Sequence, residues 1–203
     1  MSIITRLASG RKNPNRVNPY LDGKFAFSLS LDEVVKNSLK KNLDLTPVQI
    51  NALRQTDDFH RVYAKILNFI SYRPRSEFEI CSRLHQYQSN DIEGIIALLT
   101  DQGYLNDLVF AQWFVASRLT HKTRSPRALR AELARKGIAR EIIDQALTRA
   151  GDPRDTIKRI LSKKLGTAGP LAVSARQKIF AYLLRQGFGW EMVKEVVKTW
   201  ESE

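Results

Sequence analysis

Arginine and lysine side chains gather near the middle of this 203-residue chain, at a spacing suited to binding phosphate groups. On a helix, where residues advance by about 100°, Arg124, Arg127 and Arg135 project within about 80° of one another. Leu129 and Leu133 project to the opposite side, so this helix would bury its leucines and present its arginines. Guanidinium groups bind phosphate oxygens through paired hydrogen bonds, which indicates nucleic acid or another acidic polymer as partner.

The predicted binding surface extends to basic residues that precede and follow this helix. Only Glu132 interrupts the positive charge between His121 and Arg140, whereas a merely solubilising surface mixes both signs. Tyr72 lies in a basic loop, where it is placed to stack on a base. The alternative is a solvated face that binds nothing. The candidate DNA- or partner-binding side chains are Arg73, Arg75, Arg118, Lys122, Arg124, Arg127, Arg130 and Arg135.

Residues that perform catalysis or bind metals are too scattered to form a site. His60, His85 and His121 fall in different predicted helices and show no zinc-binding spacing. Cys81 is the single cysteine, so the chain has no intramolecular disulfide, which suits a reducing cytoplasm. No paired carboxylates suggest acid–base catalysis, and no glycine-rich phosphate loop is present. The sequence therefore predicts a protein that is not an enzyme and needs no metal or cofactor.

The net charge of +12 and the isoelectric point near 10.0 also favour a polyanionic partner. Residues 107–203 carry nineteen basic and ten acidic side chains, a net charge of +9, whereas residues 59–106 carry five of each. Residues 1–58 carry nine basic and six acidic side chains. No apolar run approaches the roughly 20 residues of a membrane span. We expect a soluble cytoplasmic protein that does not contact membranes.

Apolar residues recur at a period close to 50 residues, which predicts the elements that carry the basic surface. The clearest pair occurs three times, as Ile80 and Leu84, Leu129 and Leu133, and Ile179 and Leu183. Because the spacing within each pair is helical and a third helix precedes it, each copy predicts a three-helix unit. Stacked units expose one extended surface that binds macromolecules. Five aromatic residues at repeat-core spacing should pack inside: Tyr63, Tyr104, Trp113, Trp190 and Trp200.

The first residues of the chain differ from the repeats. Asp22-Gly23 lies between two β-rich segments and predicts a hairpin within a sheet of two or three antiparallel strands. Short helices should follow at 31–39 and after Thr46-Pro47. The predicted fold is mainly α: three tandem three-helix repeats in an elongated, curved monomer, with a small N-terminal antiparallel sheet. The predicted domains are 1–56, the β-hairpin extension with short helices, and 57–105, 106–150 and 151–203, the three repeats.

Three features mark helix ends within the repeats. Ser76, with Glu79 three residues later, predicts a capping box at the second helix of the first repeat. Gly137 and Gly187 should end the second helices of the second and third repeats, because glycine adopts the left-handed conformation that such ends require.

Three stretches of the chain resemble the RecX family of bacterial recombination regulators. They are residues 71–77 (SYRPRSE), residues 103–107 (GYLND) with Phe110 and Ala111, and residues 124–138 (RSPRALRAELARKGI). Residues 16–27 are similar to the β-rich extension of longer family members, so the resemblance covers essentially the whole chain. Asn106-Asp107 stands where the family often has an acidic pair, a departure that preserves the helix cap.

The resemblance implies a modular helical protein that binds filaments of the RecA recombinase on DNA and contacts DNA itself, with single-stranded and also double-stranded DNA as candidate partners. It also implies inhibition of RecA's strand exchange and ATP hydrolysis. Two other classes remain. A helical transcription regulator would be one compact module and usually a dimer, and a nucleic-acid enzyme would need carboxylate or histidine clusters. Association with a RecA filament on single-stranded DNA would separate these classes.

Overall fold

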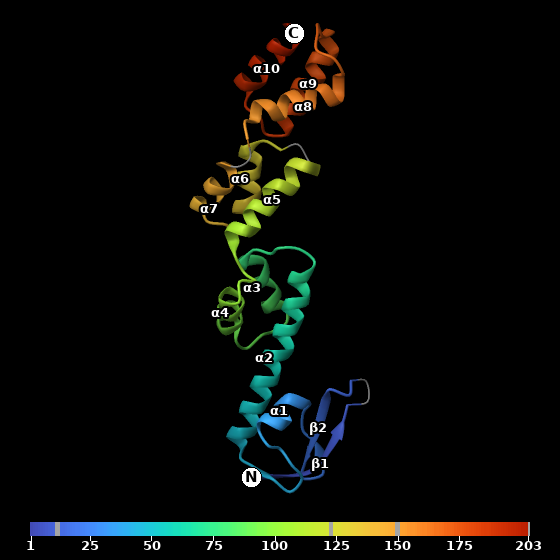
Figure 1. The fold of residues 1–203 in the computed structure, drawn as a ribbon, viewed down its shortest axis with the longest axis vertical. Coiled ribbons are helices and arrows are strands. Elements are labelled where there is room, and N and C mark those ends of the chain that lie inside the picture. Colours follow the sequence, from blue (N-terminus) through green and yellow to red (C-terminus); the bar gives the residue numbers. More distant parts are fainter. Residues whose placement is uncertain (11–12, 122–123, 149–150, 203) are drawn as a thin grey trace. The chain divides into compact units, whose positions relative to one another are not determined.

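The computed structural model describes residues 1–10, 13–121, 124–148 and 151–202. These residues form five strands and ten helices (Figure 1). The chain divides into two compact units, one of residues 1–72 and 81–98, and a second of residues 73–80 and 99–203. The prediction of a mainly helical fold with a small N-terminal antiparallel sheet is confirmed.

The N-terminal sheet is antiparallel throughout and larger than predicted. Its described strands number five rather than two or three: β1 (Ser2–Ser9), β2 (Arg16–Leu21), β3 (Lys24–Phe25), β4 (Leu29–Ser30) and β5 (Asp44–Leu45). The order is β3-β2-β1-β5, and β4 also pairs with β2. The predicted hairpin joins β2 and β3, with φ of 50° at Asp22 and 83° at Gly23. Positive φ at both central residues matches the twist of the flanking strands.

A partly buried arginine–carboxylate pair connects the sheet to the helices of the first unit. Arg16 on β2 binds both carboxylate oxygens of Asp57 at 2.7 Å, and the Ser30 N–H donates to the same carboxylate at 3.2 Å. Asp57 lies on α2 (Pro47–Ser71) and is only 5% exposed. The core around this pair contains Ile4, Leu21, Phe27, Leu29, Val34, Leu39, Leu45 and Leu53, which come from the sheet, α1 (Leu31–Lys36), α2 and their connections.

Helix α2 is one continuous helix where the sequence suggested two. Thr46 caps its start, and Gln49 completes the capping box. From Pro47 the helix runs for 25 residues, so the predicted domain boundary between residues 56 and 57 falls inside it. Helical spacing continues across Arg54–Phe59 without glycine or proline, and nothing in the sequence ends the first stretch.

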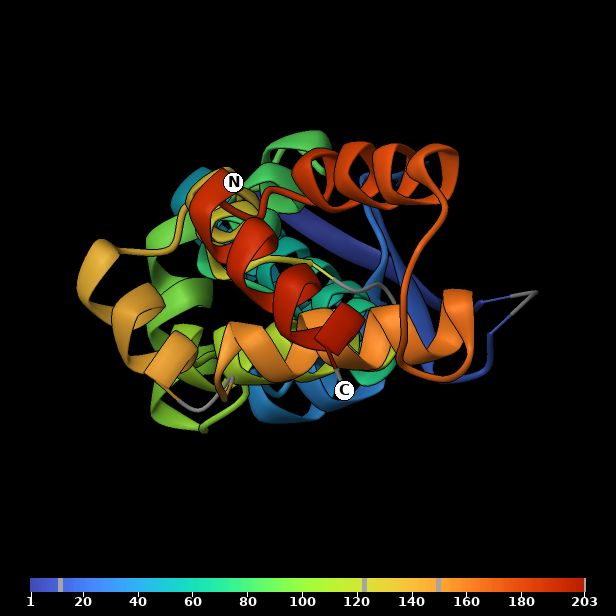
Figure 2. The same ribbon diagram turned by 90° about the horizontal axis from the view of Figure 1, so that it is seen from above.

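The remaining helices follow the predicted three-helix pattern. Each predicted apolar pair is buried, from Ile80 and Leu84 in the first repeat to Ile179 and Leu183 in the third. Figure 2 shows the helices of the third repeat, coloured orange to red. The helices are α3 (Glu77–Gln86) and α4 (Ile92–Asp101); α5 (Asp107–His121), α6 (Pro126–Ala134) and α7 (Arg140–Thr148); and α8 (Pro153–Leu165), α9 (Val173–Arg185) and α10 (Trp190–Ser202).

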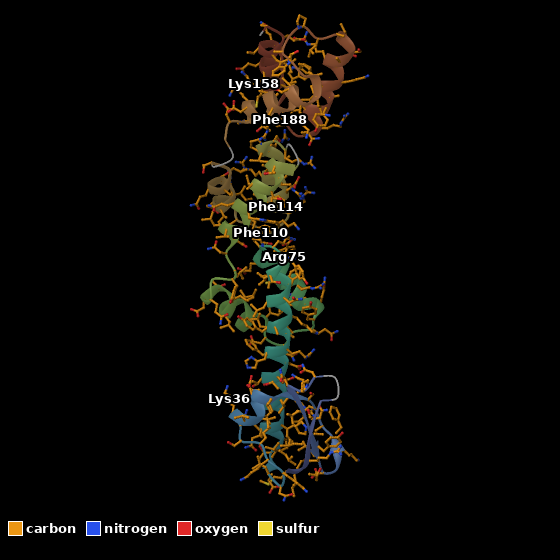
Figure 3. All side chains as sticks on the ribbon, turned by 45° about the vertical axis from the view of Figure 1, so that its right-hand side comes forward. Lys36, Arg75, Phe110, Phe114, Lys158 and Phe188 are labelled. Carbon is orange, nitrogen blue, oxygen red and sulfur yellow. The ribbon has the colours of Figure 1, made fainter. Side chains whose placement is uncertain are left out.

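Each of the last two repeats has its own apolar core. Phe110 and Phe114 of α5 are buried in the core of the second repeat, and Phe188 is buried in that of the third (Figure 3). Trp200 is buried as predicted, at 6% exposure. For Trp190 and Tyr104, which are 54% and 53% exposed, the core prediction is wrong. Trp190 begins α10 and Tyr104 follows the turn at Gly103, so both lie at helix ends rather than on buried stripes.

Candidate functional site

Helix α6 presents the central part of the predicted basic surface. The Ser125 hydroxyl caps the helix by accepting the Ala128 N–H at 3.1 Å, and it is 2% exposed. Leu129 and Leu133 are completely buried, whereas Arg127 and Arg135 are exposed. The predicted division into a leucine side and an arginine side is therefore confirmed for Arg127 and Arg135, whereas Arg124 precedes α6 and is half-buried.

Glu132 organises two of the candidate arginines. Its carboxylate binds the Arg118 Nε at 2.9 Å, and the Arg124 Nε lies 3.2 Å away as an ion pair without the alignment of a hydrogen bond. The Arg118 guanidinium also lies 4.6 Å from the centre of the Phe114 ring. Two arginines share one carboxylate, so this cluster keeps one positive charge. The sequence indicated that Glu132 interrupts the basic surface, whereas the structure shows that it orients that surface.

Glu79 binds Arg73 and Lys136 in the same way that Glu132 binds two arginines. Arg73 donates from both terminal nitrogens to the carboxylate at 3.0 and 3.1 Å, and the Lys136 Nζ lies 2.6 Å from Oε1. Burial alone would raise the pKa of Glu79, but the hydrogen bonds and charges of Arg73 and Lys136 outweigh it and lower that pKa. Arg73 also lies 5.5 Å from the Trp113 ring centre. The candidate residue Arg73 is therefore held in place by Glu79 and Trp113.

The other candidates differ in how much of their charge remains available. Arg130 binds the Asp144 carboxylate at 2.6 Å, but both side chains are about half exposed, so the pair is a weak one. Arg127 and Arg135 have no acidic partner among the described residues. Arg75 is half-buried and makes contacts of its own, and Lys122 lies outside the described residues.

Two interfaces between successive repeats fix where these side chains lie, and both belong to the second unit. In the first interface, the start of α3 packs against the second repeat. A Cβ on Gly137 would lie 2.7 Å from the Phe78 Cβ. In the second, the start of α6 packs against the third repeat, and a Cβ on Gly187 would lie 2.6 Å from the Ser125 Oγ. Both glycines have positive φ, 76° and 89°, as predicted for helix ends.

Polar contacts differ between the two interfaces. In the first, the Asp107 carboxylate accepts the Glu77 N–H at 2.9 Å, and burial raises the pKa of Asp107 despite this bond. In the second, the Ser125 N–H donates to the Gln186 carbonyl, and Arg124 donates to the Gln186 side chain, both at 3.2 Å. The first interface therefore relies on carboxylates and the second on neutral acceptors.

The sequence did not predict Glu79, Asp144 or Lys136 as members of the surface. The Arg130–Asp144 and Lys136–Glu79 contacts join residues 14 and 57 positions apart, and no short motif marks such pairs. Within the described ranges, no cluster of three or more His, Cys, Asp or Glu side chains is arranged to hold a metal ion. No described helix is both long and apolar enough to cross a membrane.

The fold and these side chains define a class: a tandem three-helix repeat protein whose arginines are oriented by half-buried carboxylates. Comparison with known proteins places the chain within that class. Residues 2–46 match the regulatory protein RecX N-terminal domain, residues 106–147 match the second three-helix domain of RecX, and residues 152–197 match the third.

Relatives and solved structures agree with these matches. The regulatory protein RecX of Bacillus velezensis is 31% identical, over all of this chain and 79% of its own length. The same protein of Bacillus subtilis is 30% identical, with the same coverage. A crystal structure of regulatory protein RecX superposes with a TM-score of 0.70 at 25% identity, covering 98% of this chain and all of its own. This chain belongs to the RecX family of regulatory proteins.

A second solved structure, RecX from Lactobacillus salivarius, shares the fold. It superposes with a TM-score of 0.61 at 22% identity and covers 73% of this chain and 99% of its own.

Proposed function

We propose that this protein regulates the RecA recombinase by binding RecA–DNA filaments and DNA. Bound protein inhibits strand exchange and ATP hydrolysis by occupancy, which modulates DNA repair. The observation that carries the proposal is the match to RecX regulatory proteins along the whole chain. The net charge of +12 supports a polyanionic partner independently of that match.

The arrangement of charge suggests how binding occurs. The clusters at Glu79 and Glu132 each hold two cations on one carboxylate, so each presents one excess positive charge in a fixed place. Arg127 and Arg135 extend from α6 without acidic partners among the described residues. These two side chains are the best candidates for phosphate contacts. Several weak contacts on one chain give strong binding, because the later contacts are intramolecular.

The first experiment titrates this protein into RecA hydrolysing ATP on single-stranded DNA. Occupancy predicts inhibition that saturates with the number of filament sites, and a protein that hydrolyses no ATP when RecA is absent. Co-sedimentation with the filament, held by a non-hydrolysable nucleotide, reports binding directly. Full ATP hydrolysis at saturating protein would refute the proposed function.

The second experiment tests the two arginines. Exchanging Arg127 and Arg135 together for Gln should lower the slope of log affinity for single-stranded DNA against log salt concentration. The expected decrease in its magnitude is about 1.4, or about 0.7 for each lost phosphate contact. Arg130→Gln is the matched control, because Arg130 lies on the same helix but is already paired with Asp144. An unchanged salt dependence in the double variant would assign these arginines to a protein partner or to solvent.

A further inference from the structure

One face of the N-terminal sheet carries a row of aromatic and cationic side chains. Arg6 on β1 pairs with Tyr20 on β2, and Tyr20 pairs with Phe25 on β3, so the three residues are direct neighbours across three adjacent strands. The Arg6 guanidinium lies 3.9 Å from the Tyr20 ring centre. The Tyr20 and Phe25 rings meet edge to face at 6.1 Å.

This row lies opposite the buried face of the sheet. Pro19 and Leu21, which flank Tyr20 on β2, are buried, and Leu21 belongs to the core of the unit. Phe25, on the two-residue strand β3, is 58% exposed, and Arg6 is exposed as well. A small antiparallel sheet needs one apolar face, and the other is ordinarily polar. A largely exposed phenylalanine there is available to a partner.

The sequence segment that contains the row is basic. The first 30 residues contain five basic side chains and one acidic side chain, a net charge of +4. The acidic residue is Asp22, whose carboxylate accepts the Ile3 N–H at 3.0 Å, a bond that lowers its pKa. Arg16 is neutralised by Asp57, but Arg6 and Lys24 have no carboxylate partner in the described part of the chain.

We propose that this row binds unpaired bases of a single-stranded nucleic acid. The Phe25 ring stacks on a base, and the Arg6 guanidinium, held 3.9 Å from the Tyr20 ring centre, meets the adjacent phosphate or a second base. Stacking requires bases whose faces are open, which favours single strands over duplexes. An acidic protein would satisfy the charge but would leave the exposed planar ring unexplained. The inference rests on the proposed function only in that it places a DNA strand within reach of the protein.

The test measures binding of the full-length protein to a fluorescent oligothymidylate by anisotropy. Phe25→Leu keeps an apolar side chain but removes the planar ring, and Phe25→Trp keeps the ring. We expect Phe25→Leu to weaken binding by about 5- to 100-fold, in line with the loss of one stacked base. Phe25→Trp should bind at least as tightly as the native protein. Val48→Ala, which alters an apolar side chain 78% exposed in the same unit, is the control and should change nothing.

The salt dependence separates stacking from charge. Arg6→Gln should reduce the slope of log affinity against log salt concentration by about 0.7, whereas Phe25→Leu should leave that slope unchanged. Native affinity in Phe25→Leu would overturn the inference. So would equal loss in Phe25→Leu and Phe25→Trp, because a stacking site tolerates any flat ring.

RecA ATP hydrolysis measured with the same variants keeps this inference apart from the proposed function. If Phe25→Leu inhibits RecA poorly but binds the oligonucleotide normally, the row contacts protein and the inference fails. If the native protein does not inhibit RecA at all, the proposed function fails, and the oligonucleotide titration alone decides the inference.

Discussion

The two interfaces between repeats share one steric device and differ in their electrostatics. In each, a positive-φ glycine that ends the second helix of one repeat lies against the first turn of the second helix of the preceding repeat. At Gly137 the neighbour is the Phe78 Cβ, and at Gly187 it is the Ser125 Oγ. Around Gly137 the chain places Glu79 and Asp107, whereas around Gly187 it places the neutral acceptors of Gln186.

The comparison separates what the repeat requires from what each copy can vary. The contact requires glycine in both copies, because a Cβ at either position would lie less than 3 Å from a side-chain atom of the preceding repeat. The polar groups around the contact vary, because several kinds of acceptor can satisfy the same helix start. The polar contacts across the first interface therefore end on the carboxylates of Glu79 and Asp107, whereas those across the second end on Gln186.

The largest expected effect is the loss of either interface glycine. Gly137→Ala and Gly187→Ala should each lower the free energy of unfolding by roughly 2–4 kcal/mol, from left-handed strain and from overpacking. Gly103→Ala is the matched control, since Gly103 has φ of 74° but nothing within 4 Å of its would-be Cβ. It should cost only the strain, about 1–2 kcal/mol. Urea unfolding measures all three, and equal losses would show that neither contact is tight.

The next effect concerns charge at the first interface. Glu79→Gln should cost about 1–2 kcal/mol, because Arg73 and Lys136 lose a charged acceptor that is partly screened by solvent. The folded-state pKa of Glu79 is lowered, so its stabilisation is present above the usual value of 4.5 and is lost as the pH falls below it. The difference between native and variant stability should therefore shrink as the pH falls below 4.5. A pH-independent difference would contradict this assignment.

The helix caps provide a smaller and more specific test. Ser76→Ala and Ser125→Ala should each cost about 1 kcal/mol, because each serine caps a helix start. The Ser125 Oγ is also the atom that a Cβ at Gly187 would meet. Ser125→Ala should therefore recover part of the stability that Gly187→Ala loses. Ser76→Ala should not relieve Gly137→Ala, because Phe78 is the obstacle there. A double-mutant cycle at each interface measures this coupling, and additive losses at the second would contradict the packing.

The smallest effect is expected for the exposed pair outside both interfaces. Asp144→Asn should change the free energy of unfolding by less than about 0.5 kcal/mol, because the Arg130–Asp144 pair is about half exposed. The same variant frees Arg130, so it should slightly strengthen DNA binding at low salt and not at high salt. A large loss of stability would show that this pair belongs to the packed structure.

Much of the fold followed from local sequence patterns. The hairpin at Asp22-Gly23, the cap at Ser76 and the buried pair Leu129 and Leu133 are all where the sequence predicted them. Two errors had local causes. No glycine or proline interrupts the helical spacing of α2 across residue 57, so the helix continues, and Trp190 is exposed because it begins α10.

The basic surface shows the same division. Helical spacing on α6 correctly placed Arg127 and Arg135 away from the leucines. It did not predict that Arg118 and Arg124 share Glu132, because helical spacing describes one helix and this cluster draws on several segments. The carboxylate of Glu79 was predicted to close a capping box, and it binds Arg73 and Lys136.

The sequence by itself determined the period, the helix ends and the sign of the charge, because these depend on residue types at fixed local spacing. Tertiary structure decided which arginines remain available, because neutralisation depends on carboxylates brought from distant positions at hydrogen-bonding range. It also decided that Gly137 and Gly187 are contact points as well as helix ends. The left-handed conformation is a local property, whereas the absence of room for a Cβ arises only when the next repeat packs against it.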